Sequence, residues 1–217
     1  MTQPADPPAN RHDRRRAATR SALIGAAREI LAQSTGTDIS IQRIAEQADV
    51  GFGTFYNHFS TKAELFEAAL TDSLEEYGRT VDALTADIED PAEVFAASVR
   101  LTVLMVESAP QLMQILRRHG LGQLNRNSGL APRALRDLER AAASGRFELS
   151  DPQATLFAIG GALIGLVEYQ FSEPPPPSAP TGESVAELLL RMLGLPAEEA
   201  REIASRPLPL PLPLPAP

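Results

Sequence analysis

The spacing of the apolar residues constrains this chain more than any other feature of its sequence. From Phe66 to Ile88 they fall at steps of three and four, which predicts one long helix over 62–89. No run alternates with a period of two between hairpin turns, and no segment repeats. The sequence therefore predicts an all-α fold, with further helices over 13–34, 40–47, 51–59, 91–108, 111–118, 132–144, 152–171, 183–193 and 197–205.

Prolines mark where the helical segments end. Fourteen of the 19 prolines lie in 4–8, 174–180 and 207–217. Because proline lacks a backbone donor and favours extended chain, these segments are predicted to be tails or linkers. The Leu-Pro stretch at the C-terminus is either inert or a ligand for an aromatic groove on a partner. Asp90-Pro91 and Asp151-Pro152 are typical of helix starts, with the aspartate as N-cap.

Composition excludes several classes of site. The chain has no cysteine and only three scattered histidines, so we expect neither a metal nor a cofactor. The net charge is −8, yet residues 1–62 hold eight cations and six acids. This asymmetry indicates an N-terminal part that faces an anion, although a chance fluctuation on a solvated surface explains it equally well. The longest apolar run, 154–167, has 14 residues, whereas a membrane span needs about 20. We therefore expect no membrane contact and a cytoplasmic location.

Residues 40–59 predict two short helices joined by a tight turn. Ser40 can cap the first helix, the turn falls at 48–50, and the second helix has phenylalanines at spacings of three and four. A helix, a turn of three or four residues and a second helix form a helix-turn-helix, which is typical of DNA binding. The second helix offers side chains suited to phosphates and base edges, namely Thr54, Tyr56, Asn57 and His58.

Cations near this segment strengthen the prediction of a nucleic-acid contact. Arg14, Arg15 and Arg16 repel one another unless phosphate or solvent takes up their charge. Lys62 is the only lysine of the chain, and it stands at a predicted helix start, where the helix dipole disfavours a cation. An external anion would explain that placement, so we expect Lys62 to contact phosphate.

The stretch 44–66 resembles the DNA-binding signature of the TetR (tetracycline-repressor) family. The similarity is carried by Gly53-Thr54-Phe55-Tyr56-Asn57-His58-Phe59, followed by Lys62-Ala63-Glu64-Leu65. A weaker similarity at 145–152 corresponds to the start of the family's dimerisation helix. The resemblance implies a small domain that binds DNA as a dimer. It also implies a larger helical domain with a small-molecule pocket and the dimer interface, and a ligand that usually releases the operator.

The resemblance also implies an organisation and individual roles. The organisation is a disordered tail over 1–12, a helix-turn-helix domain over 13–62, a ligand-binding and dimerisation domain over 63–205 and a disordered Leu/Pro tail over 206–217. Ser40, Tyr56 and Lys62 match phosphate contacts, Thr54 a base or phosphate contact, and His58 a histidine that faces the DNA backbone. The predicted DNA-binding residues are Arg14, Arg15, Arg16, Ser40, Gly51, Phe52, Gly53, Thr54, Tyr56, Asn57, His58 and Lys62.

Gly51-Phe52 departs from the family's pattern, because many relatives carry Ser or Thr there, followed by a polar or basic residue. Fewer side chains then reach the bases from the first turn of the second helix. Phe52 either contacts a thymine methyl group or packs against helix 13–34. The sequence leaves both readings open.

The predicted helix 152–171 is apolar all round between 158 and 166, so it has no face for water. Its three glycines each cost about 1 kcal/mol of helix stability, which indicates close approach by another helix. We expect it to pair with helix 183–193 across a two-fold axis, although an intrachain core would bury the same residues. The predicted dimer interface is Gly160, Gly161, Ile164, Gly165, Leu188, Leu189 and Met192.

Helices 91–108 and 111–118 carry apolar side chains that suit a pocket for a mostly apolar molecule. The predicted ligand-binding residues are Phe95, Val99, Thr102, Val103, Met113, Leu116 and His119. No Ser-His-Asp spacing, Gly-rich phosphate loop or carboxylate pair indicates an enzyme. The sequence therefore predicts a DNA-binding regulator, a ligand-responsive repressor that binds a palindromic double-stranded operator as a homodimer. The alternative is a helical enzyme or carrier for an apolar molecule, with a non-functional helix-turn-helix.

Overall fold

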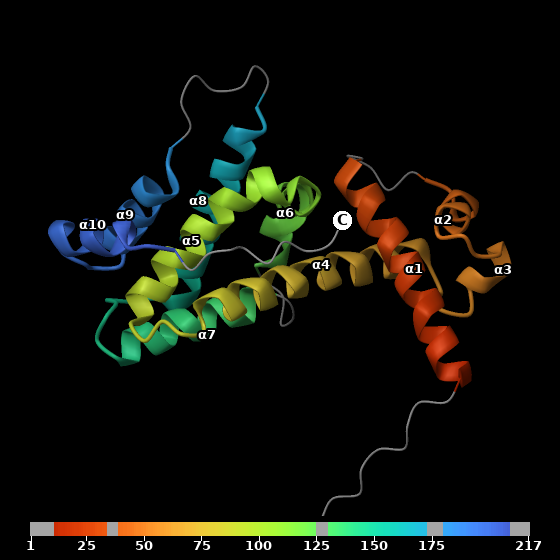
Figure 1. Cartoon of the computed structure of the whole chain (residues 1–217), viewed down its shortest axis with the longest axis horizontal. Coiled ribbons are helices and arrows are strands. Elements are labelled where there is room, and N and C mark those ends of the chain that lie inside the picture. The colour runs from red at the N-terminus through yellow and green to blue at the C-terminus, as the bar shows by residue number, and fades with distance from the viewer. Residues whose placement is uncertain (1–10, 34–38, 125–129, 173–179, 209–217) are drawn as a thin grey trace, which may run out of the picture. The chain divides into compact units, whose positions relative to one another are not determined.

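The computed structural model describes residues 11–33, 39–124, 130–172 and 180–208 (Figure 1). Within these ranges it contains ten helices and no strand, which confirms the predicted all-α fold. None of the described helices is both long and apolar enough to cross a membrane. The contacts divide the chain into two compact units, Met1–Leu70 and Thr71–Pro217.

The first unit is built from α1 (Arg11–Gln33), α2 (Ile41–Gln47), α3 (Phe52–Phe55) and the first residues of α4 (Lys62–Thr85). α1 begins two residues before the predicted helix, and residues 1–10 of the predicted tail lie outside the described ranges. Helices as short as α2 and α3 are unstable alone, so their stability comes from packing. The side chains that form this core are Leu23, Ile24, Ile30, Ile44, Phe55, Phe59 and Leu65.

The turn between α2 and α3 forms as predicted. The Ser40 hydroxyl caps α2 by accepting a hydrogen bond from the Arg43 amide at 3.1 Å. Asp49 lies in the left-handed region with φ = 53°, a conformation that Asp tolerates better than most residues. The Val50 amide then donates to the Ala45 carbonyl at 2.9 Å, which closes the turn before α3 begins.

α4 begins with a shifted capping box. The Thr61 hydroxyl accepts a hydrogen bond from the Glu64 amide at 3.1 Å, which is the bond made by an N-cap residue. The Glu64 carboxylate accepts from the Ser60 amide at 2.8 Å. In the standard box the carboxylate reaches the amide of the cap residue itself, so the reciprocal bond falls one residue earlier than expected.

The second unit contains the rest of α4 and six further helices. They are α5 (Pro91–Ser108), α6 (Pro110–Gln123), α7 (Leu130–Ala143), α8 (Pro152–Gln170), α9 (Gly182–Met192) and α10 (Ala197–Ser205). α5 contacts each of the other five, and Figure 1 shows α9 and α10 alongside it. The core around α5 includes Val99, Leu138, Leu156, Leu190 and Ile203.

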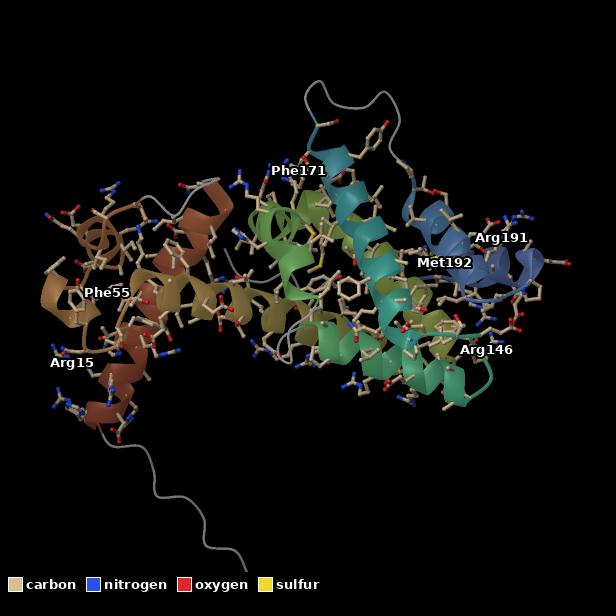
Figure 2. All side chains as sticks on the ribbon, turned by 180° about the vertical axis from the view of Figure 1, so that it is seen from behind. Arg15, Phe55, Arg146, Phe171, Arg191 and Met192 are labelled. Carbon is tan, nitrogen blue, oxygen red and sulfur yellow. The ribbon has the colours of Figure 1, made fainter. Side chains whose placement is uncertain are left out.

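Arg146, labelled in Figure 2, ties together three parts of the second unit. Asp90 and Asp151 cap α5 and α8 as predicted, each accepting a backbone amide at 3.0 Å. Arg146 donates to both carboxylate oxygens of Asp90 at 2.9 Å and to Glu199 of α10 at 2.8 Å. Burial alone would raise the pKa of Asp90, but the bonds from Arg146 and from the Ala92 amide outweigh it and hold that pKa below its ordinary value.

Three helix ends differ from the prediction by four residues or more. α3 stops at Phe55 instead of 59, because the next amides bond three residues back and form a turn. α4 stops at Thr85 instead of 89, and Ile88 keeps the apolar spacing because it lines a cavity. α6 runs to Gln123, well past the predicted end at 118. Its Gly120 packs against α8, where a Cβ atom would lie 2.9 Å from Ile164.

Candidate DNA-binding surface and effector cavity

The segment 52–59 is anchored by two phenylalanines and exposes the side chains between them. Phe55 and Phe59 are buried in the core of the first unit, and Thr54 is half-buried. Tyr56 and Asn57 lie in the turn after α3 and are exposed. The predicted polar residues are therefore presented to solvent by a turn instead of a helix face.

Phe52 does not pack against α1. Its side chain is 54% exposed, and its ring meets the ring of Tyr56 edge-on, with centroids 5.7 Å apart. Tyr56 is itself 53% exposed. One of the two readings of Phe52, burial against helix 13–34, is therefore wrong. An aromatic pair on the outer face of a short helix is available to contact a partner instead.

The N-terminal half of α1 faces the same segment across an open polar cleft. His12, Arg15, Arg16 and Thr19 line it from α1, and Asn57 and His58 line it from the turn after α3. Burial, followed by the charges of Arg16 and Arg20, lowers the pKa of His58 below its ordinary value. Arg20 also lies over the Phe59 ring, 5.2 Å from its centroid. This cleft concentrates positive charge where an anion can enter.

Of the three adjacent arginines, only Arg15 and Arg16 line the cleft, and Arg14 is exposed outside it. Figure 2 labels Arg15 on α1 and Phe55 on α3. Gly51 is the N-cap of α3, and Gly53 is exposed, with open space where a Cβ atom would stand. Because these two glycines have no side chain, the outer surface of α3 lies close to its backbone.

Lys62 has a partner inside the first unit. Its Nζ donates a hydrogen bond to the Ile39 carbonyl at 2.9 Å, and the side chain is half-buried. The cost of a cation at a helix start is thus offset within the chain, which the sequence argument did not foresee. An ammonium has three donors, so two are left for other acceptors. Ser40, beside Ile39, is exposed. Its hydroxyl oxygen accepts the bond from the Arg43 amide, so its hydroxyl proton can still be donated to another acceptor.

The second unit holds a cavity of about 180 Å³ between α4, α5, α7 and α8, here called the outer cavity. Cavities of about 150 Å³ lined by apolar side chains accommodate benzene, so this one has room for a six-membered ring. Phe95, Val99 and Thr102 line it as predicted. Val103, Met113 and His119 line neither it nor the neighbouring cavity, and Leu116 lines only the latter.

The outer cavity has a charged edge that the sequence did not reveal. Arg133 of α7 donates to Glu75 at 2.7 Å and to Asp82, both on α4. The hydrogen bond that Arg133 donates to Glu75 is the largest of the causes that raise the pKa of Arg133. The aliphatic part of the Arg133 side chain crosses α4 at Gly78, where a Cβ atom would lie 3.0 Å from Arg133 Cδ. That buried glycine was the signal available in the sequence. Asp137, one turn along α7, also lines the cavity.

A pair of buried hydroxyls, those of Tyr77 and Thr102, lines both the outer cavity and the cavity next to it. Tyr77 of α4 is hydrogen-bonded to Thr102 of α5, and burial raises the pKa of Tyr77. The Thr102 hydroxyl donates to the Ser98 carbonyl at 2.8 Å, so the proton shared with Tyr77 comes from Tyr77. The Tyr77 oxygen therefore keeps free capacity to accept a hydrogen bond.

The neighbouring cavity, here called the inner cavity, measures about 90 Å³. Apart from the hydroxyls of Tyr77 and Thr102, its lining is apolar and contains no charged residue among those described. Both cavities share Tyr77, Thr102, Leu130, Ala134, Leu156, Ile159 and Leu163. Leu74, Leu116, Ala131 and Ile164 border only the inner one.

The predicted interface residues divide into buried and exposed groups. Ile164 and Leu189 are buried within the chain, and a Cβ atom on Gly160 would lie 2.8 Å from the Leu124 side chain of α6. Gly161 and Gly165 face open space. Leu188 and Met192, the latter labelled in Figure 2, are 64% and 49% exposed. Phe157 and Tyr169 of α8 are also exposed in the single chain, and the pairing of this helix across a two-fold axis stays a prediction.

Comparisons with known proteins agree with both units. Residues 23–69 match the family described as bacterial regulatory proteins, tetR family, and residues 90–206 match the tetracyclin repressor-like C-terminal domain. None of the curated proteins matches the chain. The structure of RolR with its ligand resorcinol is 34% identical, covers 91% of this chain and 98% of RolR, and has a TM-score of 0.63. Ligand-free RolR is also 34% identical, covers 88% and 98%, and has a TM-score of 0.69.

A more distant structure shares the fold. A γ-butyrolactone receptor, an ArpA-like protein, is 18% identical, covers 88% of this chain and 96% of its own, and has a TM-score of 0.58. The C-terminal match alone spans more than half of the chain, and RolR is similar over nearly all of it. The chain therefore belongs to the TetR family of transcriptional regulators.

Proposed function

We propose that this regulator is a homodimeric repressor that binds an inverted-repeat operator and releases it when a small hydroxylated aromatic compound enters the outer cavity. The observation that carries the proposal is the outer cavity itself. It has room for one aromatic ring, and both a hydroxyl pair and a charged group line it. RolR, 34% identical, has been solved with resorcinol, a dihydroxybenzene, as its ligand.

Operator contact would use the outer face of the first unit. Arg15 and Arg16 in the polar cleft suit a DNA phosphate, with His58 and Asn57 on the opposite wall. Tyr56 and Phe52 would enter the groove, with the Phe52 ring against a thymine methyl group. Ser40 and Lys62 would each donate a further hydrogen bond to a phosphate next to the start of α2. These eight residues belong to the predicted DNA-binding set, and Lys62 has a structural role as well.

Dimerisation would use the exposed apolar side chains of α8 and α9. Phe157 and Tyr169 on α8 and Leu188 and Met192 on α9 are large apolar residues that the single chain leaves in water. Gly161 and Gly165 offer open backbone between them, which would let a second copy approach closely. Gly160, Ile164 and Leu189 would support this surface from within the chain.

The effector would be held by groups of both signs. A ring in the outer cavity would pack on Phe95 and Val99, with one hydroxyl donating to the Tyr77 oxygen. A second hydroxyl would reach the carboxylates of Asp82 or Asp137, or accept from Arg133. The sequence predicted a mostly apolar effector, and the charged edge supports adding hydroxyl groups to that description.

Coupling between effector and operator would run through α4. This helix has 24 residues; it begins with Lys62 beside the helix-turn-helix and carries Tyr77 and Asp82 to the outer cavity. A ligand that moves Asp82 or Tyr77 would therefore act on the helix that follows the recognition segment. By reciprocity, operator DNA must weaken effector binding by the same factor by which effector weakens operator binding.

The test begins with selection of bound sequences from random double-stranded DNA, followed by titration of the selected site with the full chain. We expect an inverted repeat with half-sites about one helical turn or a multiple apart, and release on addition of resorcinol. Arg15→Ala should reduce the log–log salt slope of binding by about one. Arg79→Ala, which removes an exposed cation of the second unit, should not. Failure to enrich any sequence would overturn DNA binding, and a complex indifferent to phenols would overturn the effector class.

A further inference from the structure

We propose that the effector is a dihydroxybenzene carrying an alkyl substituent of three or four carbons, with its ring in the outer cavity and its substituent in the inner cavity. This inference rests on the proposed function, and it assigns the inner cavity as the determinant of which phenol is preferred. It separates this protein from a regulator that recognises an unsubstituted ring.

The two cavities differ in chemistry. The outer cavity is edged by Asp82, Asp137 and Arg133, whereas the described lining of the inner cavity has no charged group. A charged or hydroxylated ligand atom in the inner cavity would find only Tyr77 and Thr102, whose protons already form bonds. Burial of an unpaired polar group is costly, so the inner cavity selects an apolar group.

The sizes of the cavities divide the ligand in the same way. At about 180 Å³ the outer cavity exceeds the roughly 150 Å³ that holds benzene, but it leaves little room beyond one ring and its hydroxyls. The inner cavity, at about 90 Å³, corresponds on the same scale to about three or four carbon atoms. An apolar cavity of this kind holds no water. A substituent therefore displaces no bound water and gives the lining side chains van der Waals contacts that they lack in the empty cavity.

The boundary between the cavities fixes where the ring must lie. Tyr77 and Thr102 line both, and the Tyr77 oxygen is an acceptor with its own proton already donated to Thr102. A ring hydroxyl that donates to Tyr77 places the adjoining ring edge at this boundary. Ala134 has the smallest side chain common to both linings, so a substituent would pass from one cavity to the other beside it.

The test measures the affinity of the full chain for resorcinol and its 5-methyl, 5-propyl and 5-heptyl derivatives by calorimetry. Each added methylene should strengthen binding about fourfold, from about 0.8 kcal/mol per buried group, up to three or four carbons. The propyl compound should thus bind on the order of 60-fold more tightly than resorcinol, and the heptyl compound should fall back because it exceeds the cavity.

Two variants fill the inner cavity, Leu116→Phe and Ala131→Leu, so that one remains if the other fails to fold. Operator binding by each variant checks that it is folded. The ratio of propyl to parent affinity should fall to near one in both. Val81→Phe, at a position that lines only the outer cavity, should weaken both ligands and keep their ratio.

The outcomes separate this inference from the proposed function. If resorcinol binds and releases DNA but the alkyl series is flat, the inner cavity does not take a substituent and this inference is overturned while the function stands. If the series rises in the natural chain and equally in both filled variants, the substituent lies elsewhere, which also overturns it. If no compound of the series binds, the proposed effector class itself fails.

Discussion

Phe52 is an apolar ring that the first unit leaves in water, and its role can be tested one methyl group at a time. Replacing each operator thymine by uracil removes the methyl group, and at the contacted position we expect about a fourfold loss of affinity. In Phe52→Ala that loss should disappear, because the ring is gone. Anisotropy titrations of both proteins against the substituted operators measure this.

The matched control for Phe52 is the buried ring on the same helix. Phe52→Ala should change the free energy of unfolding by less than about 0.5 kcal/mol, as for other exposed positions. Phe55→Ala should cost about 3 to 5 kcal/mol, because it empties a core position. A uracil effect that persists in Phe52→Ala would assign the methyl contact to another residue.

If His58 contacts operator DNA as predicted, we expect operator binding to depend on pH. Burial and the charges of Arg16 and Arg20 lower its pKa, so it is neutral in the free protein at pH 7. A phosphate in the cleft would raise that pKa, and DNA binding would then take up a proton. Operator affinity should therefore rise as the pH falls from about 7.5 to about 5.5, by at most about tenfold per pH unit. His58→Gln should flatten the profile, and His119→Gln should not.

Stability should respond to His58 in the opposite sense. The folded pKa lies below that of the unfolded chain, about 6.5, so the unfolded chain binds the proton more readily. The contribution to stability is full above that value and falls as the pH drops through it. Denaturation of the DNA-free protein at several pH values measures this, and a stability that rises toward pH 5.5 because of His58 would contradict the assignment.

At the scale of elements, two Asp-Pro starts provide a paired experiment on what a helix cap contributes. Asp151→Ala removes only a capping hydrogen bond and should cost about 1 kcal/mol. Asp90→Ala removes a cap and both bonds from Arg146, so it should cost about 3 kcal/mol in urea denaturation. Equal costs would mean that Arg146 contributes nothing through Asp90.

The stabilisation that Asp90 contributes should decrease at acid pH. The pKa of Asp90 is held below its ordinary value, so its extra stabilisation is present above the unfolded pKa of about 3.9. It is lost as the pH falls through the lower folded value. The difference between the natural chain and Asp90→Asn should therefore shrink below about pH 4.

Helix boundaries that depend on neighbouring residues could be predicted, and those set by packing could not. α5 and α10 were predicted to the residue and α8 to within one, because Asp-Pro caps and proline starts are written locally. The extension of α6 through Gly120 could not be read from sequence, since a glycine there usually ends a helix. In the structure Gly120 lies inside the helix and packs against α8, where a Cβ atom would lie 2.9 Å from Ile164.

For the whole molecule, assembly is testable because the proposed interface is exposed in the single chain. Leu188→Glu and Met192→Glu place charges where a second copy would bury them, so we expect monomers by sedimentation equilibrium and loss of operator binding. The single chain should keep its stability, because both side chains lie in water. Leu104→Glu, on the exposed side of α5, should leave assembly unchanged. A dimer that survives both Leu188→Glu and Met192→Glu would show that the interface lies elsewhere.

The candidate site divides in the same way as the fold. The residues of 40–62 follow one another in sequence, so their motif could be recognised without knowing the structure. The outer cavity is assembled from α4, α5, α7 and α8, and the ion pairs at its charged edge join residues more than 50 positions apart. Arg133 and Asp137 belong to a strongly amphipathic helix on which charged residues are expected in water. Only packing across Gly78 shows that they border a cavity.

The hydrogen bond from Lys62 to the Ile39 carbonyl also has a consequence for chemical modification. Because the chain contains one lysine and no cysteine, a reagent that acylates amines can react only at Lys62 and at the N-terminal amine. Lys62 Nζ is half-buried and hydrogen-bonded to the Ile39 carbonyl, so we expect the labelling rate at Lys62 to report how often that hydrogen bond opens. The protein thus carries a built-in reporter of local opening beside its DNA-binding turn, which a mass spectrometer can read with no substitution at all.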